Sequence, residues 1–122
     1  MESIAKEATQ ITRIPVPGTP VRGSRSGSPI MALFDLLGRR WAMGVLWVLS
    51  ERGPCTFREL ETGCETISPA VLNTRLKELR EAGLVIKQAP GYAVSELGRE
   101  VHACLVPLSA TSKKWAALVG KG

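Results

Sequence analysis

Apolar positions recur at helical spacing in two stretches near the start of the expected fold. Residues 29–37 carry apolar side chains three and four positions apart, and Ser28 directly before them is a suitable helix cap. Residues 41–51 are apolar on most faces, which is typical of a helix at the centre of a domain. A glycine follows each stretch, so the pattern predicts two consecutive helices.

The middle of the chain predicts a second pair of helices. A short β-prone run at 55–57 leads into one or two helical turns at 58–61. The helix expected over 69–82 has the clearest signals, because Ser68 can cap it, a proline stands in its first turn and a glycine follows its end. Its inward stripe consists of Leu72, Leu76 and Leu79.

The last third of the chain predicts a hairpin and a helix. Residues 84–88 and 92–94 read as two strands, and Ser95 then caps a long helix that Pro107 is expected to kink or divide. Together the elements predict a mainly α fold with a small β-hairpin, a winged helix-turn-helix. In such proteins the second helix of the helix-turn-helix enters the major groove of DNA.

Residues 1–28 differ from the rest of the chain because they are rich in Thr, Ser, Pro and Gly. Such a composition buries too little apolar surface to offset the entropy of ordering. We therefore expect a flexible basic N-terminal arm over 1–28 and a DNA-binding and dimerisation domain over 29–122. Contact of the arm with DNA phosphates and a solvated tail of no specific role are both open, the second being the simpler interpretation.

Composition narrows the class of protein. The formal net charge of +5 is compatible with polyanionic partners, and no apolar run reaches the ~18–20 residues of a membrane-spanning helix. Three widely spaced cysteines and an N-terminus without a secretory pattern favour the cytoplasm. Because no zinc-ligand spacing, acid–base pair with a nucleophile or phosphate-binding glycine loop is found, we expect no metal, no cofactor and no enzymatic activity.

Several blocks of the sequence, in order over residues 28–106, resemble regulators of the HxlR type. They are Gly38-Arg39-Arg40-Trp41, Phe57-Arg58-Glu59-Leu60, the central block 67–79, Ala82-Gly83-Leu84-Val85, and Tyr92 with Ser95-Glu96-Leu97-Gly98-Arg99. The resemblance implies a bacterial or archaeal transcriptional regulator, a homodimer joined through its first and last helices on a palindromic operator of double-stranded DNA. Several such regulators sense oxidation through a cysteine beside the first helix, but Ser28 stands at that position here.

The predicted recognition helix, 69–82, offers a polar outer face, and residues 84–94 form the predicted wing. With Leu72 directed inward, Asn73, Thr74 and Lys77 point outward, where they can pair with adenine, touch a thymine methyl group and reach guanine or phosphate. Arg75 lies nearer the core edge, so pairing with Glu78 or Glu81 and contact with phosphate are both open. The full predicted DNA-binding set is Ser68, Pro69, Ala70, Asn73, Thr74, Arg75, Lys77, Arg58 and Lys87.

Within that set Arg58 and Lys87 are assigned to phosphates. Arg80 is outside the set, and for it the same two roles are open as for Arg75. Two cysteines are expected to differ in exposure. Cys55 is expected to be buried, whereas Cys64 lies in the loop before the recognition helix and is expected to be partly exposed. An acidic neighbour of Cys64 is expected to raise the pKa of its thiol.

Apolar faces at both ends of the domain are too large for a monomer of this size to hide, so they predict a two-fold interface. The predicted interface residues are Ile30, Phe34, Leu37, Trp115 and Leu118. A winged-helix module that binds protein instead of DNA is the alternative, but it would need an apolar or acidic face on the helix over 69–82. No small-molecule effector is assigned by the sequence.

Overall fold

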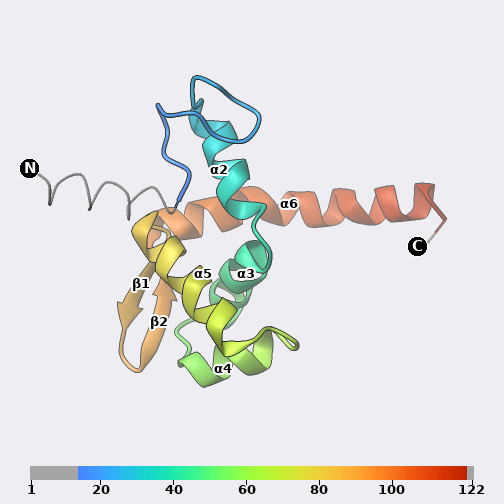
Figure 1. The fold of residues 1–122 in the computed structure, drawn as a ribbon. Coiled ribbons are helices and arrows are strands. Elements are labelled where there is room, and N and C mark those ends of the chain that lie inside the picture. The colour runs from blue at the N-terminus through green and yellow to red at the C-terminus, as the bar shows by residue number, and fades with distance from the viewer. Residues whose placement is uncertain (1–13, 121–122) are drawn as a thin grey trace, which may run out of the picture.

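The structure is a computed structural model that describes residues 14–120 of the chain. Within these residues, five helices and one hairpin follow one another in the predicted order. They are α2 (Pro29–Leu37), α3 (Ala42–Arg52), α4 (Phe57–Gly63), α5 (Pro69–Glu81), β1 (Val85–Gln88), β2 (Gly91–Val94) and α6 (Glu96–Leu118). The order confirms a mainly α fold with a small antiparallel hairpin. Figure 1 shows α3, α4, α5 and the hairpin in one body. The C-terminal half of α6, which we call its far half, extends beyond this body.

Three of the helices begin at the predicted serine caps. The hydroxyl of Ser28 accepts the N–H of Met31, that of Ser68 accepts the N–H of Val71, and that of Ser95 accepts the N–H of Gly98. Each bond satisfies one of the backbone donors that a helix N-terminus leaves free. These local signals explain why the starts of α2, α5 and α6 could be predicted to the residue.

The predicted strand at 55–57 is wrong in extent. Only Cys55 pairs, in a single antiparallel bridge with Tyr92. Thr56 instead caps α4: its hydroxyl accepts the N–H of Glu59 at 3.1 Å, and the Glu59 carboxylate accepts the N–H of Thr56 at 2.8 Å. This capping box draws Phe57 into the helix and so ends the strand after one residue.

Pro107 does not divide the last helix, which runs as one 23-residue α-helix. A proline inside a helix removes the N–H that would bond to the carbonyl four residues earlier. Here both Pro107 and Ala103, which carries that carbonyl, are exposed residues, so water can replace the lost bond. The helix therefore continues through the proline to Leu118.

The core lies between α3, α5 and the hairpin. Val45, Leu46 and Leu49 of α3 are fully buried, and the predicted stripe of α5 meets them from the other side. Burial of one such side chain contributes about 1.5–3 kcal/mol. The central position predicted for residues 41–51 is therefore confirmed. The inner face of α5 packs against this core.

Part of the predicted arm makes contacts in the structure. Residues 14–28 form turns in which the N–H of Gly18 bonds to the carbonyl of Gly27 and Ile14 packs against the core. The N–H of Arg22 donates to the Asp35 carboxylate of α2 at 3.0 Å. Residues 1–13 of the arm lie outside the described residues, and the division at residue 28 stays a prediction.

In residues 14–120, no helix has both the length and the apolar character needed to cross a membrane. Over the same range, no group of three or more His, Cys, Asp or Glu side chains is placed to hold a metal ion.

Candidate nucleic-acid interface

The outer face of α5 is open to solvent along its length. Asn73, Thr74 and Lys77 are all exposed there, as are Pro69 and Ala70 at the start of the helix. The Thr74 hydroxyl donates to the carbonyl of Ala70 at 3.1 Å, within the same helix. Its methyl group is therefore the part of Thr74 left for an apolar contact.

The inner side of α5 is attached to the turn between α2 and α3 by charged groups. Glu78 is buried, and its carboxylate accepts from Arg39 at 2.8 Å and from Arg75 at 3.0 Å. Arg75 also donates through Nε to the carbonyl of Arg40 at 2.7 Å. Of the two roles open for Arg75, the structure shows pairing with Glu78.

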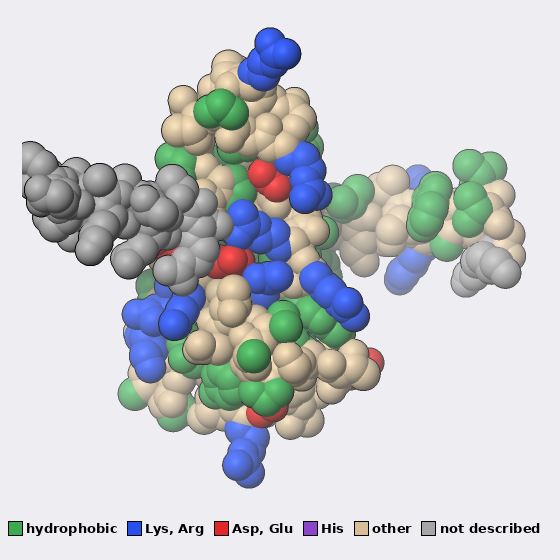
Figure 2. All heavy atoms as spheres, in the orientation of Figure 1, with side chains coloured by type: hydrophobic (Ala, Val, Ile, Leu, Met, Phe, Trp, Pro, Cys, Tyr) green, Lys and Arg blue, Asp and Glu red, His purple; other side chains and the backbone are tan. Residues whose placement is uncertain are grey.

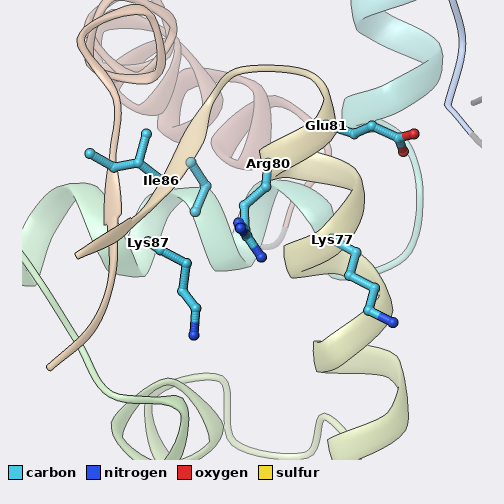
Figure 3. A pocket seen from close by; sticks show the side chains of 6 residues that line it. Lys77, Arg80, Glu81, Ile86 and Lys87 are labelled. Carbon is cyan, nitrogen blue, oxygen red and sulfur yellow. The ribbon is translucent and has the colours of Figure 1, made fainter. Parts of the chain in front are cut away.

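A cleft lies between the end of α5 and the first strand of the hairpin. Lys77 and Arg80 border it from α5 and Lys87 from β1, and its volume is about 440 Å³. Figure 3 shows Arg80 between the two lysines, with the Glu81 carboxylate directed away from them. We call this the helix–wing cleft; it brings Lys87 of the hairpin next to two cations of α5.

Lys87 is held beside an aromatic ring, since its Nζ lies 5.0 Å from the centroid of Tyr92. Such a cation–π contact restricts a long side chain without removing its charge. Sequence reasoning left the role of Arg80 undecided; the missing signal was its position across from Lys87, which depends on how the hairpin folds back on α5. Arg58 is exposed on α4 and is not among the residues that line the cleft.

Figure 2 views the molecule from the side of α5 and shows blue Lys and Arg side chains spread over this face. Acidic side chains on the same face are sparse. Such a surface creates a positive potential that attracts a polyanion.

The two cysteines near α4 lie in the core. Cys55 is buried as expected, but the partial exposure expected for Cys64 is wrong, because only 5% of it is exposed. Cys64 ends α4, with its N–H bonded to the carbonyl of Leu60, and its side chain packs into the core. Burial raises the pKa of both thiols, and the positive charge of Arg52 opposes that shift. For Cys64 the cause is burial and not the neighbouring carboxylate of Glu65.

The residues predicted for a two-fold interface divide into exposed and buried. Ile30 and Phe34 on α2 are 53% and 57% exposed, and Trp115 and Leu118 on α6 are 64% and 83% exposed. Leu37, in contrast, is buried in the core of the chain itself, because it ends α2 on the side that packs against α3.

Comparisons with known proteins point to one family. A family model described as HxlR-like helix-turn-helix matches residues 36–119. The uncharacterized HTH-type transcriptional regulator BH0655 of Halalkalibacterium halodurans is 36% identical over 58 residues, which cover 48% of this chain and about half, 51%, of that regulator. The uncharacterized HTH-type regulator YybR of Bacillus subtilis is 28% identical over 99 residues, or 75% of each chain.

Two solved structures have a similar fold. Quinone-bound YodB from B. subtilis has 31% sequence identity and a TM-score of 0.66, over 70% of this chain and 97% of YodB. A possible HxlR family transcriptional factor from Thermoplasma volcanium has 26% identity and a TM-score of 0.62, over 78% of this chain and 87% of that one.

Proposed function

The chain belongs to the HxlR-like helix-turn-helix family of transcriptional regulators, and from that premise we propose that it is a homodimeric regulator that binds double-stranded DNA through α5. The observation that carries the proposal is the division of α5 into two faces. Its inner face is fixed to the core and to the turn after α2, while its outer face presents exposed hydrogen-bonding side chains. Insertion into the major groove requires a helix that is held rigidly by the domain on one side and presents exposed polar side chains on the other.

On the outer face, Asn73 and Thr74 are assigned to base edges, and Lys77 to guanine or to a phosphate. An asparagine side chain can pair with adenine through two hydrogen bonds, and the free Thr74 methyl group suits the methyl group of thymine. Ser68, Pro69 and Ala70 form the small, rigid start of the helix, which lets the backbone come close to DNA.

Contacts with phosphate are assigned to Lys87 of the wing and to Arg58 of α4, and the helix–wing cleft adds Arg80. Positive side chains on phosphates set the register of a DNA complex but carry no sequence information themselves. We exclude Arg75 from this group because its guanidinium already binds Glu78 and the Arg40 carbonyl.

A second copy of the chain is assigned to the exposed faces of α2 and α6. Ile30 and Phe34 would meet Trp115 and Leu118 across a two-fold axis, so that two copies of α5 read the two halves of a palindromic operator. A DNA-binding regulator of this kind works in the cytoplasm, where its operator lies.

The dependence of DNA affinity on salt tests the proposal. The logarithm of the association constant should fall linearly with the logarithm of salt concentration, because bound cations on the phosphates are released. Lys77→Ala should make that slope shallower by about one for each Lys77 that binds phosphate. Lys113→Ala removes the same charge from the exposed far half of α6 and should leave the slope as it is. An affinity that does not depend on salt would contradict the proposal.

A further inference from the structure

Glu78 is the one charged residue that is buried in the part of the chain that the structure describes. Its two carboxylate oxygens bind different arginines. Oε2 accepts from Arg39 at 2.8 Å, and Oε1 accepts from Arg75 at 3.0 Å. The arrangement is a triad in which one buried carboxylate joins two guanidinium groups from separate elements.

The triad joins α5 to the turn between α2 and α3 at two points. One is the Arg39 side chain, and the other is the carbonyl of Arg40, which accepts from Nε of Arg75 at 2.7 Å. Arg75 therefore uses two of its nitrogens at once, which the planar fork of a guanidinium allows and an ammonium group does not. The turn itself ends at Trp41, whose φ of 74° is left-handed and whose side chain packs against the core.

We infer that Glu78 is a positioning residue that fixes the recognition helix α5 relative to α2, and so sets the spacing between the two recognition helices of a dimer. The inference rests on the proposed function and deepens it. Arg39 and Arg40 directly follow α2, which bears Ile30 and Phe34 of the proposed two-fold interface. On α5 the same triad lies next to the helix turns that bear Asn73 and Lys77.

The orientation of α5 relative to α2 matters because the separation of two DNA half-sites changes by only a small distance for each base pair between them. Two half-sites one helical turn apart are ~34–36 Å apart over ~10–10.5 base pairs, so one base pair changes the separation by roughly 3.4 Å. An ion triad around a buried carboxylate is weak evidence for stability, since apolar side chains of similar volume often replace buried ion pairs without loss. Its two-point geometry, in contrast, fixes one relative orientation of the joined elements.

The test compares Glu78→Gln with Glu81→Gln in the full-length chain. Both variants remove one carboxylate from α5, but Glu81 is exposed. The wild-type protein first selects its preferred duplex from random DNA. Affinities are then measured for that duplex, for the same duplex with one base pair inserted between its halves, and for random DNA, all at one salt concentration.

Glu78→Gln should reduce the preference for the selected duplex over the inserted one by about tenfold, while random-DNA affinity stays within about threefold of wild type. Glu81→Gln should keep the wild-type preference. A merely structural role would lower all three affinities together, so that result would overturn the inference, as would an unchanged preference in Glu78→Gln.

Arg39→Gln is the second variant, because it leaves Glu78 paired with Arg75 and so keeps the buried charge compensated. It should reduce the preference by about threefold, and it decides the question if Glu78→Gln is unfolded by circular dichroism. A wild-type chain that selects no duplex at all would contradict the proposed function and the inference together. Normal selection with an unchanged preference in the variants would contradict only the role of Glu78.

Discussion

The body of the molecule and the far half of α6 use the same kinds of apolar residue in opposite ways. In the body, Leu46 of α3 and Leu76 of α5 are almost completely buried against each other's elements. At the far end of α6, Trp115 and Leu118 are mostly exposed. Figure 1 shows the reason, since this half of α6 runs past the body and has no other described element beside it.

The difference teaches that a hydrophobic stripe identifies a face but not the chain that covers it. For α3 and α5 the covering surface comes from the same chain. A large exposed apolar patch on a small protein marks an interaction site in most cases. We therefore assign the patch on α6 to a second copy, and the following predictions test whether the two regions differ as described.

The largest effect is expected in the body. Leu76→Ala should lower the free energy of unfolding by about 2–5 kcal/mol, because it removes a buried side chain and leaves a cavity. Denaturant unfolding measures it. Leu118→Ala is the matched control and should change the stability of the dissociated chain by less than about 0.5 kcal/mol. Equal losses in both variants would remove the distinction between the regions.

The next effect concerns assembly at the far end of α6. The wild-type chain should be a dimer by light scattering at micromolar concentration, and Trp115→Ala should weaken the dimer by about 2 kcal/mol, or roughly thirtyfold in Kd. Aromatic residues at an interface commonly have effects of this size when truncated. A wild-type monomer under these conditions would show that the exposed face of α6 is not a self-association surface.

A smaller effect concerns the thiols of the body. Burial raises the pKa of Cys55 and Cys64, so at a given pH each forms less of the reactive thiolate than an ordinary cysteine does. Their alkylation should be at least about tenfold slower in the folded than in the unfolded chain at neutral pH. The rate in the folded chain should rise only at higher pH than in the unfolded one. Mass spectrometry of the alkylated chain measures both rates, and rapid labelling of Cys64 in the folded chain would argue against its burial.

Features determined by neighbours in the sequence could be predicted. Ser28, Ser68 and Ser95 cap helices through bonds to residues three positions on, and these starts were predicted correctly. The capping box at Thr56 is equally local, but the β-prone composition of 55–57 concealed it.

Features determined by contacts between distant segments could not be predicted. Arg39 and Glu78 are 39 positions apart, and their pairing depends on how α5 lies against the turn after α2. Cys64 and Leu37 were expected at a surface from their local surroundings, yet both pack into the core. The proximity of Arg80 to Lys87 likewise appears only once the hairpin has folded beside α5.

The central claim is that α5 contacts base edges while the wing binds the phosphates of the DNA backbone. Comparison of Asn73→Ala with Lys87→Ala, on the operator and on random DNA at one salt concentration, tests it most directly. Asn73→Ala should cost about 1–3 kcal/mol on the operator and little on random DNA, whereas Lys87→Ala should weaken both similarly. If Asn73→Ala lowered both affinities by the same factor, or changed neither, the assignment of the outer face of α5 to base readout would be wrong.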